Sequence, residues 1–377
     1  MAKLGDYISP AKNIKCGDGN YPVLSMTMHD GIVLQSERFK KSLASSDQSG
    51  YKVVAYGQLV VGFPIDEGVL YLQRTIAQGI MSPAYNVWDV DYSCVDPSYF
   101  ELSLHSPQAM QYYKENLRGS TARRRSLPKE VLLELPLKMP AIDEQKRIAA
   151  TIENLTHLID TRRKQIDKID ELVKSRFVEM FGDPVSNPNS FVKKRLKDTC
   201  VIVTGNTPSR AVIEYYGDYI EWIKTDNIVQ GILNPTTAVE NLSEKGAEVG
   251  KIVEKNAILM ACIAGSVASI GKVCITDRAV AFNQQINAIL PKEYNVLFLY
   301  VLFQISNVYL VEDLNMALKG ILSKSRLESK EFIVPPLDLQ NQFATFVAQV
   351  DKSKLAVQKS LEQLEILKKS LMQAYFG

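Results

Sequence analysis

Two segments of the chain, residues 140–182 and 335–377, place apolar side chains at alternating spacings of four and three. Shifting the sequence by 195 positions superimposes one segment on the other without an insertion or deletion. The repeated apolar positions are Ile148, Ile152, Leu155, Ile159, Ile166, Ile169 and Val173 in the first segment, and Phe343, Val347, Val350, Val357, Leu361 and Leu364 in the second. Such a repeat is typical of a coiled-coil seam, so the pattern predicts two long helices that pair with each other.

Charged residues interrupt this seam at Arg162, Lys354 and Lys368. We hypothesise that they fix the register and the antiparallel direction of the helices at some cost in stability. On that hypothesis, leucine at positions 162 and 354 would raise the melting temperature. The alternative is that each segment is an ordinary amphipathic helix on its own globular domain. The length of the segments, the narrow seam and its recurrence in both halves favour the paired helices.

The ends of the two segments also match. Pro140 and Gln145 recur as Pro335 and Gln340 after the same shift. Asp143 is expected to cap the first helix, because a side-chain carboxylate can accept hydrogen bonds from free backbone N–H groups there. Gly182 and the proline two residues later are expected to end it.

The rest of the chain reads as two globular domains, residues 1–139 and 191–334, with a polar linker at 183–190. The first is expected to contain strands at 53–63 and 68–72 and a helix at 107–117. The second is expected to contain strands at 197–203, 219–223, 257–264, 271–276 and 288–290, and a helix at 297–311. The predicted fold is therefore α+β (mixed α/β), a tandem duplication in which two domains are joined by two long antiparallel helices related by a pseudo-twofold axis.

Composition narrows the class of protein. The chain has 377 residues, enough for two or three domains, with 46% hydrophobic and 23% charged residues. It contains no apolar run long enough for a membrane span, so no membrane association is expected. Its five cysteines are scattered, which favours reduced thiols, a cytoplasmic location and no structural metal site.

Several polar and basic stretches are candidates for contact with nucleic acid. Asparagine and glutamine can make two hydrogen bonds to adenine, and arginine or lysine can make two to guanine. Two basic loops occupy equivalent places before the long segments, and polar clusters are scattered through the second domain. The candidates are Arg123, Arg124 and Arg125 in the first loop; Lys324 and Arg326 in the second; and Thr204, Asn206, Thr207, Ser209, Lys224, Thr225, Asn227, Lys272, Asn283, Gln284 and Gln285 elsewhere. Turns use the same residue types, so ordinary turn chemistry is the alternative for the polar clusters.

Catalytic motifs are scarce. The three histidines have no metal-ligand spacing, and no Gly-x-Ser-x-Gly elbow occurs. Residues 265–273 approach a phosphate-binding loop, but they have one residue too many between the glycines and lack the final Ser or Thr. The sequence therefore predicts a binding protein without catalytic residues, a metal or a cofactor of its own.

Taken together, these stretches resemble the specificity subunits of type I restriction-modification enzymes. The segment beginning at Pro335 resembles the Pro-Pro-x-x-Glu-Gln motif that begins each long helix of that family, and residues 204–209 are similar to its Gly-x-Thr-Pro loop. Residues 270–272 and 282–285 are also typical of it. The chain departs from the family at Leu339, where a glutamate is usual, and the first domain lacks a Gly-x-Thr-Pro loop.

The resemblance implies a function. Each globular domain would be a target-recognition domain that reads one half of a bipartite double-stranded DNA sequence. The helix pair would set the spacing and dock two methyltransferase subunits. S-adenosylmethionine, ATP and magnesium would belong to these and to motor-nuclease subunits.

Two other classes of protein remain as alternatives. One is a coiled-coil adaptor that binds only proteins and has no DNA specificity. The other is a self-contained methyltransferase or nuclease, against which the missing motifs argue. Sequence-specific DNA binding separates the first alternative from a specificity subunit, and unaided DNA methylation would support the second.

Overall fold

A computed structural model describes residues 2–28, 30–38, 47–117, 127–263, 269–312 and 320–377. The chain forms two compact units, and each takes part of both long helices. Unit 1 comprises Met1–Thr161 with Leu361–Gly377, and unit 2 comprises Arg162–Ser360. The predicted domain boundaries thus differ from these units, which divide the helices instead of separating them from the globular parts.

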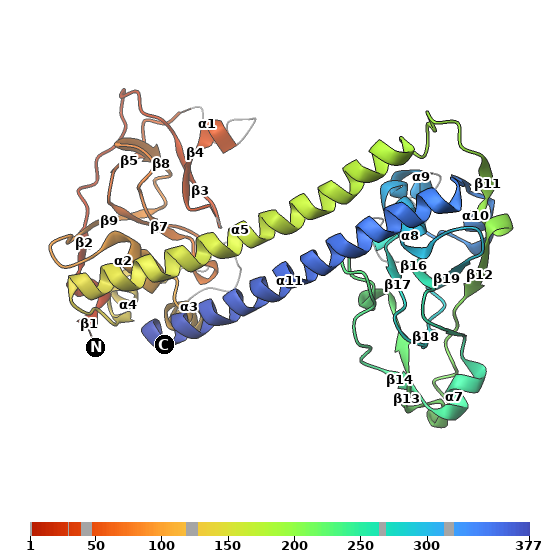
Figure 1. The fold of residues 1–377 in the computed structure, drawn as a ribbon. Helices are drawn as coiled ribbons and strands as arrows, with labels where there is room; N and C mark the ends of the chain where they lie inside the picture. Colours follow the sequence, from red (N-terminus) through yellow and green to blue (C-terminus); the bar gives the residue numbers. More distant parts are fainter. Residues whose placement is uncertain (1, 29, 39–46, 118–126, 264–268, 313–319) are drawn as a thin grey trace. The chain divides into compact units, whose positions relative to one another are not determined.

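Unit 1 contains short strands and helices followed by the first half of a long helix (Figure 1). Its elements in order are β1 (Ala2–Lys3), η1 (Leu4–Asp6), β2 (Ile8–Pro10), β3 (Leu24–Met26), β4 (Ile32–Leu34), α1 (Gln35–Arg38), β5 (Lys52–Ala55), β6 (Leu59–Val61), η2 (Ile65–Glu67), β7 (Leu70–Leu72), β8 (Gln78–Met81), β9 (Asn86–Val90), α2 (Pro97–Leu104), α3 (Pro107–Asn116), α4 (Lys129–Leu133), β10 (Pro136–Leu137) and the start of α5 (Ile142–Phe181).

Unit 2 repeats this plan. After the end of α5 come β11 (Lys193–Arg195), α6 (Leu196–Thr199), β12 (Cys200–Thr204), η4 (Ile213–Tyr215), β13 (Tyr216–Ile223), η5 (Thr225–Asn227), β14 (Asn241–Leu242), α7 (Glu244–Val249), β15 (Ile252–Val253), β16 (Ile258–Ala261), β17 (Val273–Ile275), β18 (Val280–Phe282), β19 (Ile286–Pro291), α8 (Val296–Ile305), α9 (Asn307–Val311), α10 (Lys324–Ser329), β20 (Glu331–Ile333) and the start of α11 (Leu337–Phe376).

One four-stranded sheet has the same topology in both units, while the second sheet of unit 2, in the order β14-β13-β18-β15, has no four-stranded counterpart in unit 1. Unit 1 has a four-stranded sheet in the order β2-β9-β6-β7, and unit 2 has one in the order β12-β19-β16-β17. All neighbouring strands in both sheets are antiparallel. A two-stranded pair, β1-β10 or β11-β20, joins the start of each unit to the segment that leads into the next long helix. The α+β fold and the duplication predicted from the sequence are confirmed.

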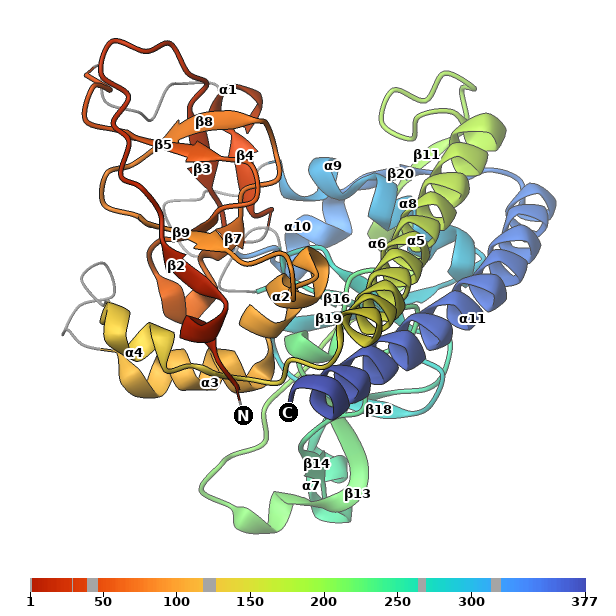
Figure 2. The same ribbon diagram turned by 90° about the vertical axis from the view of Figure 1, so that its left-hand side faces the viewer.

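Strands β6 and β7 of unit 1 and strands β16 and β17 of unit 2 are buried on both faces. In unit 1, Leu59 and Val61 pack with helices α2 and α3, while Val60 between them packs toward β3 and β5. In unit 2, Ile258 packs toward α8, while Leu259 packs toward β18. Figures 1 and 2 show helices α2, α3 and α4 of unit 1 on the opposite side of its four-stranded sheet from its smaller strands β3, β4, β5 and β8. Burial on both faces explains why these strands read as continuous apolar runs rather than as alternating patterns.

The predicted seam positions are buried or half-buried. In unit 1, Ile148, Ile152, Leu155 and Ile159 are buried, and Leu361 and Leu364 are half-buried. In unit 2, Phe343 and Val347 are buried, and Ile166, Ile169, Val173, Val350 and Val357 are half-buried.

The ends of the long helices meet within each unit. Phe177 and Phe181 near the end of α5 pack on Phe343 near the start of α11, with ring centroids 5.5 Å apart in both pairs. In unit 1, Ile148 near the start of α5 packs in one cluster with Phe376 at the end of α11. The helices are therefore antiparallel in each unit.

A buried glutamine near the start of each long helix makes the same three hydrogen bonds in both units. Gln145 accepts from the backbone N–H of Asp96 (2.9 Å) and donates to the carbonyls of Cys94 (3.0 Å) and Pro140 (2.8 Å). The corresponding bonds of Gln340 join its side chain to the N–H of Asn295 (2.9 Å) and the carbonyls of Glu293 (3.3 Å) and Pro335 (2.8 Å). Asp96 and Asn295 are the N-cap residues of α2 and α8. The glutamines thus fasten a long helix to the globular body of its unit.

Several element predictions are confirmed and several are wrong in detail. The helix at 107–117 is α3, and the left-handed Gly182 (φ 73°) ends α5 as expected. Asp143 is not the N-cap, because α5 begins at Ile142 and the N–H groups of Glu144 and Gln145 bond the carbonyl of Ala141. The carboxylate of Asp143 instead lies in the first turn, where the helix dipole favours a negative charge.

Three predicted elements are split. The strand at 53–63 is divided into β5 and β6 by a turn at Gly57, whose φ is 88°. The first part of the strand at 197–203 is the short helix α6, because Leu196 turns into the core. The helix at 297–311 breaks at Ser306 into α8 and α9.

The seam lysine of unit 2 has specific partners. The ammonium group of Lys354 donates to Asp170 Oδ1 on α5 (2.5 Å) and to the carbonyl of Gly231 (2.8 Å), and the residue is 7% exposed. It therefore links both long helices to the loop after η5. This arrangement argues against the expectation that leucine would be stabilising at position 354, since the substitution would remove the ammonium group that the Gly231 carbonyl and the Asp170 carboxylate bond.

We predict that Gln340→Leu lowers the free energy of unfolding by about 2–3 kcal/mol, because three backbone groups lose their partner in a buried place. Chemical denaturation followed by circular dichroism measures the change. Gln342→Leu is the matched control, since Gln342 is exposed on the same helix and its replacement should change stability by less than about 0.5 kcal/mol. Equal effects of the two substitutions would contradict the assigned role of Gln340.

We predict that Lys354→Met, which keeps the length of the side chain, lowers the melting temperature and costs about 1–3 kcal/mol. Lys352→Met removes an exposed charge two residues away and should have little effect. Differential scanning calorimetry compares the two variants with the unmodified chain. A higher melting temperature for Lys354→Met would restore the interpretation that the charge only weakens the seam.

Candidate nucleic-acid interface

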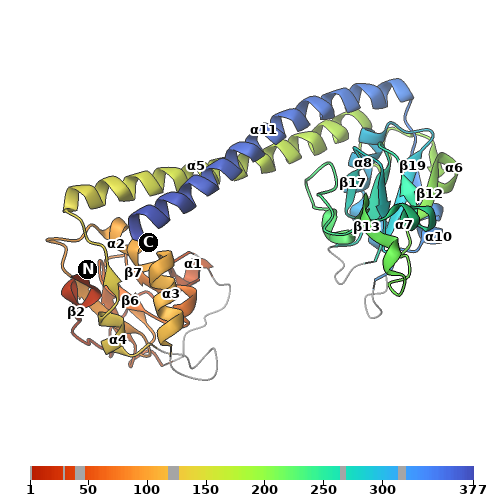
Figure 3. The ribbon, with the colours of Figure 1, turned by 90° about the horizontal axis from the view of Figure 1, so that it is seen from below.

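Most of the predicted contact segments of unit 2 meet at one end of the sheet β12-β19-β16-β17, of which strands β12, β19 and β17 are labelled in Figure 3. Thr204 ends β12, and Ile286 begins the neighbouring strand β19. The loop after Thr204 therefore lies beside residues 283–285. Two backbone hydrogen bonds fix this approach, from Gly205 N to Ile286 O (3.0 Å) and from Asn206 N to Phe282 O (3.1 Å).

Glycine is required at position 205. A Cβ atom there would lie 2.2 Å from the carbonyl oxygen of Asn283, a distance that no side chain tolerates. The adjacent side chains also bond across the two segments: Thr204 Oγ1 donates to Asn287 Oδ1 (2.7 Å), and the Thr207 hydroxyl donates to Gln284. The Gly-x-Thr-Pro loop is thus built onto the start of β19.

The other predicted segments reach the same place through backbone contacts. Asn283 N donates to Ile223 O (3.0 Å), which brings the segment from Lys224 to Asn227 next to it. Cys262 N donates to Gln285 O (2.8 Å), and Leu322 N donates to Cys262 O (2.9 Å), which brings in the chain that leads to Lys324. Lys272 lies in the connection from β16 to β17, where its carbonyl accepts from Ala261 N (2.9 Å).

Three of the predicted asparagines use their amides to hold the fold. Asn206 donates to Val249 O and accepts from Lys251 N, both at 2.8 Å. Asn227 is 7% exposed, and its amide oxygen accepts from Lys224 N at 2.9 Å. Asn283, also 7% exposed, accepts from Gln285 N at 3.1 Å. These side chains hold the loops in place, so the turn interpretation describes them best.

The remaining predicted residues have different exposures. Thr207, Ser209 and Gln284 are exposed, and Lys224, Lys272 and Gln285 are half-buried. Thr225 lies in η5. Lys324 begins helix α10, which also carries Arg326, and both are exposed. The predicted residues Arg123, Arg124 and Arg125 lie outside the described part of the chain.

An ion-pair cluster that sequence reasoning missed lies beside these loops. Arg210 makes two hydrogen bonds to the carboxylate of Glu240, at 2.7 and 2.9 Å, and Lys224 bonds the same carboxylate. The guanidinium carbon of Arg210 lies 4.5 Å from the ring centroid of Tyr216, and Lys224 Nζ lies 5.1 Å from that of Trp222. The only sequence signal for Arg210 is that it directly follows the Thr-Pro-Ser segment.

This cluster fixes two cations at the candidate interface. Hydrogen bonds from Arg210 and Lys224 lower the pKa of Glu240 to about 2. Because the pKa is depressed in the folded state, the pair contributes stability above the usual glutamate pKa, and this is lost as the pH falls toward 2. At neutral pH the carboxylate is ionised and compensates part of the positive charge that a phosphate would otherwise meet.

Comparison with known proteins identifies a domain in the second half of the chain. Residues 188–366 match the family model for the type I restriction modification DNA specificity domain. The specificity subunit of the type I restriction enzyme HindI from Haemophilus influenzae is 32% identical over an alignment 174 residues long, which covers 42% of this chain and 37% of that protein. Residues 188–366 therefore form a type I restriction modification DNA specificity domain.

Two further curated relatives come from Methanocaldococcus jannaschii. The MjaIX specificity subunit is 27% identical over 50% of this chain and 43% of its own length, and the MjaVIII specificity subunit is 21% identical over 99% and 90%. The first two relatives are therefore matched over less than half of their own length.

Two solved structures have the same fold. A chain from a study of complex assembly and conformational transition in a type I restriction-modification system aligns with a TM-score of 0.58 at 17% identity, covering 100% of this chain and 96% of that one. The S subunit of such a system from M. genitalium aligns with a TM-score of 0.57 at 16% identity, covering 100% and 95%.

The described residues contain no cluster of three or more side chains that could hold a metal ion. His105 lies in unit 1, where its two ring nitrogens contact the carbonyls of Glu101 (2.8 Å) and Gly68 (2.9 Å). In the same described residues, no helix is both long and apolar enough to cross a membrane.

We predict that Glu240→Gln increases affinity for duplex DNA, because the substitution removes a negative charge and frees two cations to bind phosphates. Binding measured by fluorescence anisotropy at several salt concentrations should depend more steeply on salt, with the slope rising by about one for each additional phosphate that is neutralised. Glu214→Gln, which breaks the exposed pair with Lys245 elsewhere in unit 2, is the control. A decrease in affinity specific to Glu240→Gln would show that the pair positions the loops instead of restraining its cations.

Proposed function

We propose that the chain is the sequence-specific DNA-binding subunit of a type I restriction-modification complex and reads a bipartite double-stranded target. The globular part of each unit contacts one half of the target. The observation that carries the proposal is the duplication itself: two units that share the strand order of one sheet, in a chain that contains a DNA specificity domain.

The chemistry of unit 2 supports DNA as the ligand. One end of its sheet gathers hydroxyl, amide and basic side chains, and exposed members such as Thr207, Gln284 and Lys324 come from different loops. Basic groups contact phosphates and position the duplex, and amides and arginine can read base edges. A sheet that carries such loops at one end suits this division of tasks.

The long helices serve as the spacing element and as the docking site for two methyltransferase subunits. Each unit exposes large apolar side chains on these helices away from the seam, including Leu158 and Ile366 in unit 1 and Leu172 and Leu355 in unit 2, with exposed fractions of 43–62%. Such side chains on an otherwise polar helix mark surfaces for protein partners.

The chemistry of the complex belongs to the partner subunits. The methyltransferase subunits bind S-adenosylmethionine and modify adenine, and motor-nuclease subunits bind ATP and magnesium and cut unmodified DNA. The complex works in the cytoplasm, where its DNA target lies.

We predict that cells carrying this chain with its methyltransferase subunit show adenine methylation at a split motif with a fixed gap. Methylome sequencing measures this directly. Exchange of residues 191–334 for the corresponding segment of a relative should change one half of the motif and leave the other half and the gap unchanged.

The same experiment tests the adaptor alternative. If the complex forms and binds the methyl donor but no motif appears, the helices are better explained as a scaffold for proteins. Methylation by the purified chain alone would contradict the assignment of catalysis to partner subunits.

A further inference from the structure

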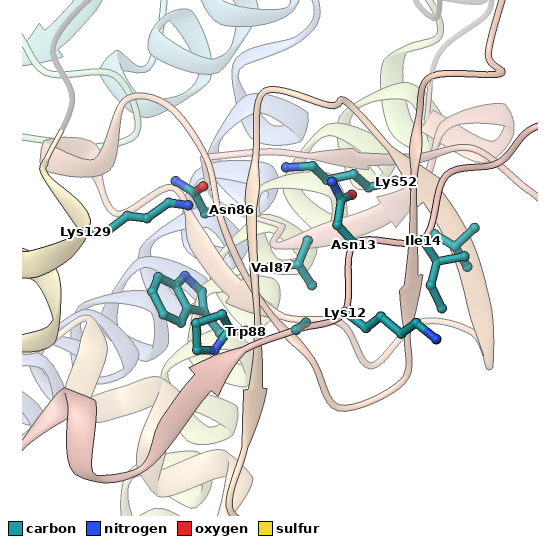
Figure 4. Close-up of a pocket in the computed structure, with 11 residues that line it drawn as sticks. Lys12, Asn13, Ile14, Lys52, Asn86, Val87, Trp88 and Lys129 are labelled. Carbon is teal, nitrogen blue, oxygen red and sulfur yellow. The ribbon is translucent and has the colours of Figure 1, made fainter.

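Unit 1 contains a cavity of about 140 Å³ that is lined by basic and amide side chains (Figure 4). It lies between the segment that follows β2, the start of β9 and the first residue of α4. The polar side chains that line it are Lys12, Asn13, Lys52, Asn86, Trp88 and Lys129. A single water needs only about 10–15 Å³ of such space, so the cavity can hold a larger group or several waters.

The charges around this cavity have one sign. Among the described residues, its lining contains three lysines and no aspartate or glutamate. In Figure 4 the ammonium ends of Lys52 and Lys129 point toward a common space, with the amide of Asn86 beside Lys129. Burial, together with the charge of Lys129, lowers the pKa of Lys52. Two cations that approach each other in a hollow repel each other, and an anion between them would relieve this repulsion.

A buried donor in the lining has no partner. Trp88 is 2% exposed, and its indole Nε1 makes no hydrogen bond in the described part of unit 1. A buried N–H group without an acceptor is costly, and such groups are rare in native proteins. An oxygen ligand in the cavity is the simplest acceptor for this hydrogen.

The cavity occupies the topological position of the candidate interface in unit 2. Strands β2 and β9 are the counterparts of β12 and β19, and the cavity lies where β2 ends and β9 begins. In unit 2 the same corner holds the loop from Thr204 to Ser209. Lys129 begins α4 as Lys324 begins α10, and the two are 195 positions apart, the same shift that relates the long helices.

We propose that this cavity binds a phosphate group of the DNA backbone and so gives unit 1 an anchoring contact at the corner that the Gly-x-Thr-Pro loop occupies in unit 2. The proposal rests on the proposed function. Lys52 and Lys129 supply the positive charge, and Asn86 and the indole N–H of Trp88 supply neutral donors. A phosphate at this corner fixes the register of the first half-site without reading its bases.

The test is Lys129→Gln in the full-length chain, because Lys129 is exposed and its loss should not affect folding. Binding is measured on a duplex with the motif found by methylome sequencing, over a range of salt concentrations. The slope of log affinity against log salt should fall by about one, and affinity at 0.1 M salt should fall by about eightfold. Lys146→Gln removes an exposed charge of the same unit on α5, and we expect it to leave the slope unchanged.

A second measurement locates the phosphate. Neutral methylphosphonates replace single phosphates along the first half-site. One position should weaken binding of the unmodified chain, and the same position should have little further effect on Lys129→Gln. If Lys129 acts only through the overall electrostatic potential of the protein, the two changes will weaken binding independently and this coupling will be absent.

The outcomes separate the two proposals. If the unmodified chain lacks specific DNA binding, the proposed function fails. If it binds specifically but Lys129→Gln behaves like Lys146→Gln, the function stands and the phosphate site is wrong. Titration with inorganic phosphate, followed by the fluorescence of Trp88 in a Trp222→Phe variant, tests a free anion as the ligand. Saturation at micromolar phosphate without any change in DNA binding would overturn the assignment to the DNA backbone.

Discussion

Within each unit, the position of the long helix on the globular body depends on a buried glutamine amide near the start of that helix. Gln145 and Gln340 are at most 1% exposed, and each joins its helix to the N-terminus of a short helix on the globular body. Because a buried amide must satisfy both its donors and its acceptor, it permits only one orientation of the two helices. Apolar packing alone would tolerate sliding or rotation, so the hydrogen bonds fix the direction in which the long helix leaves the body.

The sequence predicted the long helices well because their signal is periodic over about forty residues and needs no knowledge of distant contacts. It also showed that Gln145 and Gln340 are equivalent, but not what they do, since two of the three partners of each lie 45 to 51 residues away in the chain. The short strands were harder to predict. Strands β5 and β6 form one apolar run, and only the left-handed Gly57 shows that the chain turns between them.

The candidate site shows a different limit of sequence reasoning. The loops were predicted because their residue types are unusual, and the sheet does bring them together at one end. Which side chains remain available could not be predicted, because Asn206 and Gln284 are both amides in polar loops. The structure uses both ends of the Asn206 amide internally and leaves Gln284 exposed. Arg210 and the lysines of unit 1 belong to no sequence motif. The chain contains many basic residues, and only the fold shows which of them lie at a candidate site.

The duplication explains how two equal frameworks can carry unequal chemistry. The strand order, the buried glutamine and the short helix before the last strand recur in both units, because these features keep the unit folded and attached to its helix. The corner at the end of the first strand of the four-stranded sheet, β2 in unit 1 and β12 in unit 2, has no such structural role. In unit 2 it holds a glycine-dependent loop against β19, and in unit 1 it holds a cavity between lysines. If each corner only has to meet DNA, its residues are free to differ, and a protein built this way can change one half of its target while the framework of both halves stays the same.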